Sequence, residues 1–388
     1  MKRIYLDYAA TTPVDPRVAK AMAVFLSEKF GNTMSLHSFG QEAKIVLEES
    51  RAKLADMINA KPNEIIFTSS ATESNNLAIK GVAFGANPAF AKASAGKHII
   101  ISSIEHHCVE EAVKWLSRGF KVTKIPVDKY GVVNPKDVEK EIRPETILVS
   151  IIHASNEIGT IQNIAEIGKI CRGKKVYFHT DASQSFGKIE IDVKKMNIDL
   201  LTASSHKIYG PKGAGLLYLR EGIKLVPLLH GGGQENGLRS STVNVGAIVG
   251  FAAAAEIYKK EREKENKKLT KLKDKLIKGI LKIDGSYLNG HPVKRLANNI
   301  NVWFKFVEGE SMVIQLDLCG IACSTGSACS SFKLEPSPVL LAIGLKPQEA
   351  HGSLRISLGR FTTEKEIDYL LEVLPKIVKK IREMSPFK

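Results

Sequence analysis

The stretch from Val176 to Lys207 decides the fold. It contains two short apolar runs, VYF at 176–178 and LLT at 200–202, and polar residues follow each of them, HTDASQ and then ASSHK. Four more apolar runs precede them, at 65–67, 98–101, 122–125 and 147–152. Amphipathic segments lie between these runs or just before the first, as at 43–58 and 110–117. Strands that alternate with helices predict an α/β fold with a mostly parallel sheet. Ligands bind beyond the carboxyl ends of such strands, where the polar clusters fall.

The amino-acid composition of the chain changes near residue 256. Residues 257–281 are rich in Lys and Glu, with four aliphatic residues at helical spacing (Leu269, Leu272, Leu276 and Ile280). This pattern predicts a long surface helix that leads into a second domain. Beyond it, short strands at 299–306 and 354–358 mix with helices, the last at 365–384. We therefore predict a segment 1–15 that associates with a small domain, a large ligand-binding domain over 16–256, and the small α+β domain over 257–388.

Composition narrows the class of protein. The 388 residues include 56 Lys and Arg against 41 Asp and Glu, a net charge of +15. No window interleaves aromatic with basic residues as single-strand binders do, so we expect a solvated basic surface and no nucleic-acid partner. The longest apolar run, 245–255, is too short to span a bilayer, and charges at Lys2 and Arg3 precede any signal core. We expect a cytoplasmic protein without a membrane partner, whose five cysteines are thiols rather than a disulfide framework.

Lys207 is the first candidate for chemistry. It follows an apolar strand and stands among hydroxyls, a histidine and a glycine-rich turn that ends at Gly213. A lysine held out of water can lose its proton and attack a carbonyl, although a lysine that caps a loop is the plainer interpretation.

Three further stretches supply what a pyridoxal 5′-phosphate (PLP) site needs. Asp181 lies just beyond a strand, where a carboxylate could keep the pyridine nitrogen of PLP protonated. The hydroxyl-rich stretch 68–76 lies between a strand and a helix, which suits a phosphate. His106 offers an aromatic plane. Each residue alone is more often a cap or a core residue, but all of them follow strands, and together they predict a PLP site.

A wider set of motifs gives a specific resemblance. The motifs are YLDYAATTP (5–13), ATESNN (71–76), EH (105–106), NEIGT (156–160), DASQ (181–184), SSHK (204–207), GGGQE (231–235), GSAC (326–329) and SLGR (357–360). In this combination the chain resembles the cysteine desulfurases of the class V aminotransferase group, within the fold-type I PLP-dependent transferases. The resemblance implies a large PLP-binding domain with a mostly parallel mixed sheet and a smaller α+β C-terminal domain.

The resemblance also implies roles for single residues. Lys207 would carry PLP as a Schiff base, Asp181 would pair with the pyridinium nitrogen, and His106 would stack on the ring and accept a proton. Other positions would bind the rest of the cofactor: Asn156 and Gln184 at the ring hydroxyl, and Ala71, Thr72, Ser204 and His206 near the phosphate, joined by Thr242 from a second subunit. Arg355 would clamp the substrate carboxylate bidentately, with Asn156 and Asn32 as further candidates for substrate binding.

Cys329 identifies the subtype within the resemblance. Residues 324–331 carry little apolar bulk, so we expect a mobile segment that suits a nucleophile carrying sulfur. Cys329 would take sulfur from L-cysteine as a persulfide and release L-alanine. The long segment through Pro336 and Pro338 resembles the desulfurases that pass persulfide to an iron–sulfur scaffold or another sulfur acceptor, so Cys329 is also a candidate for a transient iron–sulfur ligand.

The other cysteines indicate no resident metal. The spacing Cys319-x3-Cys323-x5-Cys329 matches no standard zinc pattern. Cys323 is either a small buried residue or a helper thiol, and we expect Cys108 and Cys171 to be packing residues.

Two alternatives stay open, and two positions depart from the family pattern. Family members commonly have Arg at the position of Asn236 and Gly at that of Ser241, which bears on the subunit boundary of the implied homodimer. One alternative is another class V PLP-dependent aminotransferase or lyase in which Cys329 is incidental. The other is a non-catalytic scaffold that binds cluster-assembly proteins, or RNA, through its basic surface.

Overall fold

A computed structural model describes residues 3–85, 97–326 and 335–385. Its largest sheet, within this part of the chain, has seven strands in the order β2-β8-β7-β6-β5-β3-β4. They are β2 (Ile65–Thr68), β3 (His98–Ser102), β4 (Lys121–Ile125), β5 (Thr146–Ser150), β6 (Tyr177–Asp181), β7 (Leu200–Ser204) and β8 (Gly215–Leu219). Only β8 pairs antiparallel, with both of its neighbours. The predicted α/β fold with a mostly parallel sheet is confirmed.

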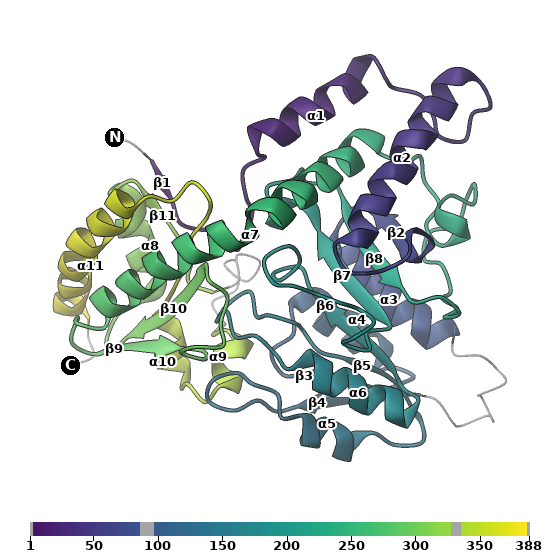
Figure 1. Cartoon of the computed structure of the whole chain (residues 1–388). Coiled ribbons are helices and arrows are strands. Elements are labelled where there is room, and N and C mark those ends of the chain that lie inside the picture. Colours follow the sequence, from purple (N-terminus) through teal and green to yellow (C-terminus); the bar gives the residue numbers. More distant parts are fainter. Residues whose placement is uncertain (1–2, 86–96, 327–334, 386–388) are drawn as a thin grey trace.

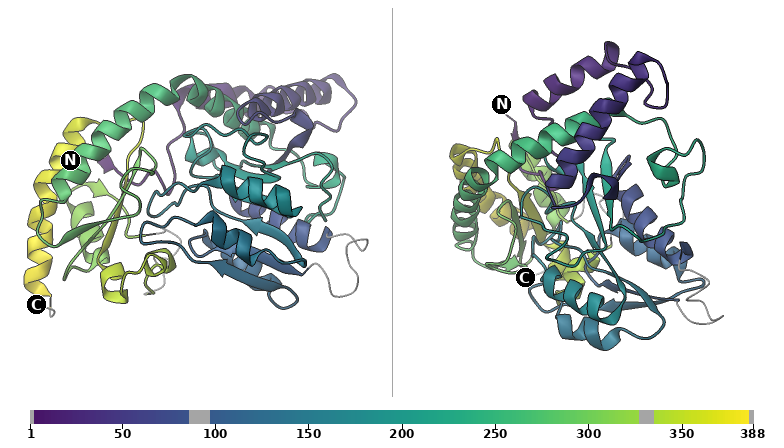
Figure 2. Two further views of the ribbon diagram at one scale, coloured as in Figure 1. Left: turned by 60° about the horizontal axis from the view of Figure 1, so that its bottom comes forward. Right: turned by 45° about the vertical axis from the view of Figure 1, so that its right-hand side comes forward.

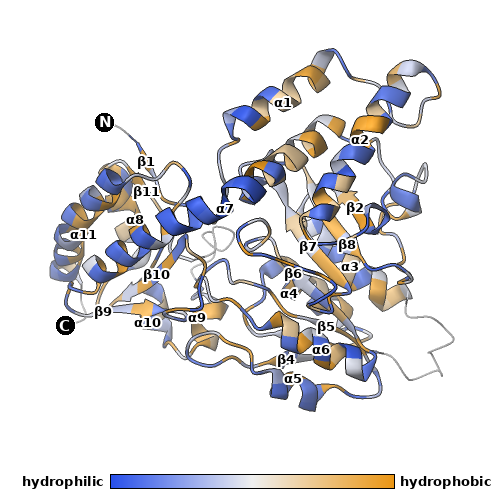
Figure 3. Ribbon diagram, in the orientation of Figure 1, coloured by the Kyte–Doolittle hydropathy of each residue, from blue (hydrophilic) through white to orange (hydrophobic). Residues whose placement is uncertain are grey.

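Both faces of the sheet are buried, which is why its strands are continuous apolar runs in the sequence. Ile99 and Ile101 pack on one face of the sheet, and Ile100 packs on the other. The first face is covered by α3 (Ala71–Gly85) and α4 (His107–Leu116). The second is covered by α2 (Ser38–Asp56), α5 (Pro135–Glu141), α6 (Ile164–Lys174) and the first half of α7 (Val245–Ile280), and α1 (Pro16–Ser27) packs against α7. A parallel sheet buried on both faces has no polar side, which Figure 3 shows as hydrophobic colour along β7 and β8.

A second, smaller unit lies at the far side of the molecule from this sheet (Figure 1). Its antiparallel sheet has the order β12-β10-β9. The strands are β9 (Ser286–Asn289), β10 (Asn299–Phe304) and β12 (Ser353–Ser357), and the helices are α8 (Gly309–Leu318), α9 (Pro338–Ala342), α10 (Pro347–His351) and α11 (Glu364–Met384). The chain start joins this unit, because β1 (Ile4–Tyr5) pairs with β11 (Ile321–Ala322). Ile4 and Leu6 also belong to its apolar core.

One helix contributes to both cores. α7 runs from Val245 to Ile280, and Figure 2 shows it spanning the molecule from α1 and α2 to α11. Its first half packs into the large core through residues such as Phe251, and its second half packs into the small core through residues such as Leu276. The sequence predicted a helix only over 257–281 and treated 245–255 as a separate apolar run. Both belong to one helix, and its composition changes because burial changes along it. No helix in the described ranges is both long and apolar enough to cross a membrane.

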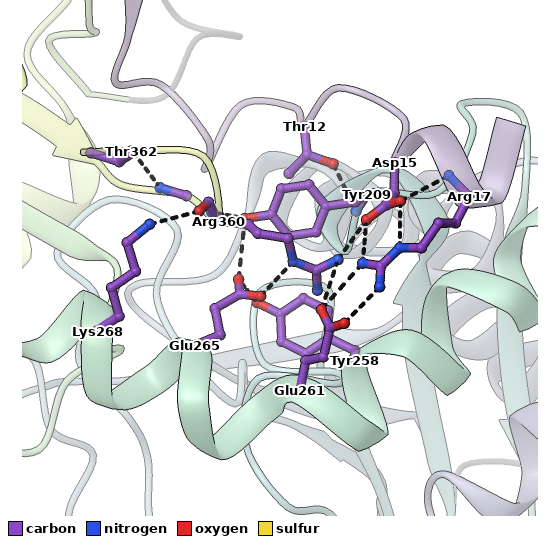
Figure 4. A network of polar contacts seen from close by, with 11 residues as sticks. Thr12, Asp15, Arg17, Tyr209, Tyr258, Glu261, Glu265, Lys268, Arg360 and Thr362 are labelled. Atoms are coloured by element: carbon purple, nitrogen blue, oxygen red, sulfur yellow. Dashed lines mark hydrogen bonds and ion pairs between the residues drawn. The ribbon is translucent and has the colours of Figure 1, made fainter.

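A buried charge network joins the two units near the carboxyl end of β7 (Figure 4). Arg360, just beyond β12, donates from Nε to Glu265 of α7 at 2.7 Å and from Nη1 to Asp15 at 2.7 Å. Its guanidinium also stacks on the ring of Tyr209, 4.6 Å from the centroid. Tyr209 has a positive φ of 67°, a strained value for a bulky residue. The network holds this turn, two residues after Lys207, against the C-terminal unit.

Candidate functional site

A cavity of about 210 Å³ lies beyond the carboxyl ends of the central strands. Nine of the residues predicted from the sequence line it: Ala71, Thr72, His106, Asn156, Asp181, Gln184, His206, Lys207 and Arg355. The other lining residues are Ser70, from the hydroxyl-rich stretch 68–76, Cys108, which was expected to be a packing residue, and Ala9, Ala10, Ile152 and Ser183, which were given no individual role. Side chains from both units of the fold therefore line one cavity.

Lys207 ends a short 3₁₀ turn that follows β7, and its amine faces the N-terminal segment. Nζ donates hydrogen bonds to the carbonyl oxygens of Ala9, at 2.6 Å, and Ala10, at 2.7 Å. The motif YLDYAATTP thus forms one wall of the cavity. The adjoining His206 is held neutral, because burial and the neighbouring lysine lower its pKa to about 4.

Asp181 is a buried carboxylate at the end of β6 with both oxygens oriented. Oδ1 accepts from the backbone N–H of Ser183 at 2.8 Å and from its hydroxyl at 2.5 Å. Oδ2 accepts from Asn75 Nδ2 at 2.8 Å. Asn75 lies inside the ATESNN motif and is fully buried, but the sequence analysis did not single it out.

The part of the cavity wall at the start of α3 suits a phosphate. Ala71 and Thr72 begin the 15-residue helix α3, whose first N–H groups have no carbonyl partners within the helix. Gly215 of β8 lets the backbone come close here, because a Cβ at this position would lie 2.7 Å from the Ser70 carbonyl carbon. A neutral His206 can still donate one ring N–H to an anion.

His106 forms the N-cap of α4, and its Nδ1 accepts the backbone N–H of Cys108 at 3.2 Å. Burial lowers the pKa of His106. Its neighbour Glu105 is fully buried, which raises the pKa of its carboxyl to about 8. Glu105 accepts from the backbone N–H of Ile152 at 2.8 Å and so ties the end of β3 to the end of β5.

Two cysteines that were predicted to be packing residues differ in position. Cys171 does pack in the large core, fully buried on α6. Cys108 also packs as predicted, against the core between the sheet, α3 and α4, but its thiol in addition lines the cavity and contacts His106 Nδ1 at 2.9 Å and Asn75 Nδ2 at 3.0 Å. It reaches the site because it lies in the first turn of α4, directly after His106.

Arg355 of β12 reaches the cavity from the small unit and is almost fully buried. Its Nη2 pairs with Asp7 at 2.8 Å, and its Nη1 donates to the carbonyl oxygen of Asn156 at 3.3 Å. Its Nε is buried and has no partner among the described residues. Asp7, which the sequence analysis did not assign, therefore orients the guanidinium predicted to bind the substrate.

Other predicted residues lie elsewhere. Ser204 is buried at the end of β7 but is not part of the cavity wall. Asn32 and Thr242 are exposed and away from the cavity of their own chain. Cys323 packs against the small core, where burial raises its pKa to about 12. Cys329 lies outside the described residues. The described residues hold no group of three His, Cys, Asp or Glu that could bind a metal ion.

The residues present fit PLP. Three groups line one cavity: the amine of Lys207, the buried carboxylate of Asp181 and the N-terminus of α3. Gly215 lets the backbone of β8 come close to the start of α3. These groups match the aldehyde, the pyridinium nitrogen and the phosphate of this cofactor.

Comparisons with known proteins agree with this geometry. Residues 4–370 match the model of the aminotransferase class-V family. A cysteine desulfurase IscS from Archaeoglobus fulgidus is 54% identical over 98% of both chains. The mitochondrial cysteine desulfurase of Saccharomyces cerevisiae is 51% identical over 99% of this chain and 76% of its own. A solved NifS-like protein superimposes with a TM-score of 0.90 at 41% identity, over 97% of this chain and 100% of its own.

These likenesses confirm the fold predicted from the motifs, that of the fold-type I transferases. The chain belongs to the class V aminotransferase family, whose enzymes depend on pyridoxal 5′-phosphate.

Proposed function

We propose that this protein is a cysteine desulfurase, which takes sulfur from L-cysteine, releases L-alanine and supplies sulfur for iron–sulfur cluster assembly. The observation that carries the proposal is the meeting of Lys207, Asp181 and Arg355 around one cavity, in a chain that is about half identical to proteins of that name. A solved relative described as SspA in complex with cysteine is 39% identical, with a TM-score of 0.81 over 93% of this chain and 100% of its own.

Each residue has a task that follows from its position. Lys207 holds PLP, Asp181 keeps its ring nitrogen protonated, and the start of α3 with His206 binds its phosphate. PLP, when bound, supplies an electron sink that makes the substrate Cα proton acidic. Lys207 then takes that proton, because its amine lies on the cavity wall. Arg355 binds the substrate carboxylate, and its guanidinium is already oriented by Asp7.

Cys329 carries the sulfur. An S–S bond forms between Cys329 Sγ and the substrate sulfur while the substrate Cβ–S bond breaks. The electron pair of the broken bond stays with the substrate, Cβ gains a proton in place of the one that the Cys329 thiol loses, and Lys207 returns its proton to Cα, which gives alanine. The Cys329 thiol plus L-cysteine thus gives Cys329 persulfide plus L-alanine. The Cys329 sulfur and the transferred sulfur are each oxidised by one electron and the substrate Cβ is reduced by two, so no further oxidant is needed.

Product analysis tests this function against the alternative aminotransferase or lyase. With L-cysteine and a thiol reductant, the PLP-loaded protein should give alanine and sulfide in equal amounts. Cys329→Ala should keep the yellow colour of the bound cofactor and form no sulfide, whereas Cys171→Ala should retain turnover because that thiol is buried far from the cavity. Keto acid as the product, or normal turnover in Cys329→Ala, contradicts the proposal.

We also propose that the protein is a homodimer. Six large apolar side chains are exposed on the end of α1, the following loop and α2: Leu26, Phe30, Met34, Leu36, Phe39 and Ile45. An apolar patch of this kind is usually covered by another protein. Thr242 and Asn32 are exposed outside their own cavity, which supports their reaching a second subunit.

The sulfur acceptor we propose is an iron–sulfur scaffold protein in the cytoplasm. The support is the long segment around Cys329 in the sequence together with the names of the relatives. Nucleic acid is not the acceptor we propose, and a stable salt-sensitive complex with RNA in the absence of desulfurase activity would favour the scaffold alternative.

A further inference from the structure

A chain of contacts links the carboxylate of Asp181 to the imidazole of His106. Asn75 Nδ2 lies 2.8 Å from Asp181 Oδ2 and 3.0 Å from Cys108 Sγ. Cys108 Sγ in turn lies 2.9 Å from His106 Nδ1. Asn75 is fully buried, and its Oδ1 has no partner within the described ranges. Nothing in the sequence motifs or the comparisons gives Cys108 a role.

The donor and the acceptor of each hydrogen bond between Asp181, Asn75, Cys108 and His106 follow from which groups carry a hydrogen. An ionised carboxylate only accepts, so the Asn75 atom that faces Asp181 is the amide nitrogen. Its second hydrogen points to the sulfur, so Cys108 Sγ accepts from Asn75. The thiol hydrogen is then available for His106 Nδ1. Burial raises the pKa of Cys108 to about 12, which keeps that hydrogen on the sulfur. Thr72 also lies within hydrogen-bond reach of the same thiol.

A backbone hydrogen bond shows that His106 Nδ1 is an acceptor. The N–H of Cys108 donates to His106 Nδ1 at 3.2 Å, so Nδ1 is an acceptor. A neutral imidazole with an acceptor at Nδ1 carries its hydrogen on Nε2. Two donors therefore converge on Nδ1, and both of them come from Cys108.

We propose, building on the desulfurase function above, that Cys108 is a positioning residue that holds His106 as the neutral imidazole protonated at Nε2. The histidine therefore enters the reaction with a proton to donate, and not, as the sequence analysis expected, as a proton acceptor. Asn75 couples this arrangement to the carboxylate that faces the cofactor ring.

The proposal predicts a signed change in the titration of His106. Protonation at Nδ1 must displace the thiol hydrogen bond, so removal of that donor raises the pKa of His106. Asp181 of β6, Lys207 after β7, Arg355 of β12 and the adjoining His107 also act on this ring, and none of them changes in the variants. The loss of one neutral hydrogen bond predicts a rise in pKa of about 0.5 to 1.

Nitrogen NMR of the holoenzyme labelled with [15N]histidine tests this directly, with His106 assigned by its absence in His106→Gln. The wild type should show hydrogen on Nε2 and not on Nδ1. Cys108→Ala should raise the pKa of His106 and lower kcat about fivefold to tenfold with KM little changed, and Cys108→Ser, which keeps a donor, should restore most of both. Cys171→Ala controls for loss of a buried thiol and should leave this titration unchanged.

Hydrogen on Nδ1 in the wild type overturns the proposal, as does an unchanged His106 pKa in Cys108→Ala. If Cys108→Ala does not fold, the wild-type spectrum and Cys108→Ser still decide. Absence of alanine production by the wild type would instead contradict the desulfurase function and would leave the tautomer result standing.

Discussion

Lys207 and Lys188 both lie beyond the carboxyl ends of the central strands, after β7 and β6 respectively. Lys188 is 6% exposed, and burial lowers its pKa to about 7, so a lowered pKa alone would make it a candidate to hold PLP. Yet Lys188 Nζ contacts Gln184 Oε1 at 3.4 Å and lies outside the cavity wall, whereas Lys207 forms part of that wall. Position on the cavity wall, and not a lowered pKa, is therefore the reason for proposing that Lys207 holds PLP.

This choice can be measured by borohydride reduction of the PLP-loaded protein followed by peptide mapping. Lys207→Ala should lose the reduced cofactor adduct, because no other amine lines the described cavity. Lys188→Met should keep it on Lys207. An adduct that persists in Lys207→Ala, or that maps to Lys188, contradicts the assignment.

At the same scale, the sequence predicted the residues that directly follow strands and missed those brought in from elsewhere. Asp181, His106 and Lys207 could be predicted because an apolar run that ends in polar residues marks the carboxyl edge of a sheet. Asp7 and Ala9 could not be placed from pattern alone, because they reach the site from more than 190 residues away, against Arg355 and Lys207. The place of the Cys108 thiol on the cavity wall was not predicted, because an isolated thiol in an amphipathic helix indicates a packing residue, which Cys108 also is.

Among the elements, the start of α7 and the strand β8 were not predicted from the sequence. The two halves of α7 differ in composition because one is buried on several sides and the other faces solvent on one side, so the sequence pattern predicted a helix only from residue 257 and missed its start at Val245. β8 was not predicted. It follows β7 after the connection 205–214, which contains a short 3₁₀ turn but no α-helix, so the β–α alternation that revealed the other strands is interrupted there.

The network that anchors α7 gives a stability prediction. Arg360→Ala leaves the buried Asp15 and Glu265 without their shared cation, so the free energy of unfolding should fall by about 3–5 kcal/mol. Arg17→Ala removes a cation from the same network at a position where the side chain is 52% exposed. It should cost about 1 kcal/mol or less. Urea unfolding of both variants checks the difference, and equal losses would show that Arg360 is not the centre of the network.

On the scale of the whole molecule, the exposed apolar patch between α1 and α2 predicts the oligomeric state. Leu36 is 93% exposed and lies at the centre of the patch in the sequence. Leu36→Lys should convert the proposed dimer into a monomer at micromolar concentration, because a buried unpaired charge opposes association. Val293→Lys, at an apolar residue 79% exposed on the small unit, is the matched control. Sedimentation that shows a monomeric wild type, or a dimeric Leu36→Lys, contradicts the proposal.

The transfer of sulfur to Cys329 is the central claim, and peptide mass spectrometry after brief exposure of the holoenzyme to L-cysteine tests it most directly. Residues 306–332 contain no Lys or Arg, so trypsin leaves Cys319, Cys323 and Cys329 in one peptide. This peptide should gain the mass of one sulfur atom in step with alanine release, with fragment ions that place the gain on Cys329, and the peptides that contain Cys108 and Cys171 should not gain it. Alanine release with the extra sulfur on any other cysteine, or no gain on Cys329 during turnover, would contradict the account.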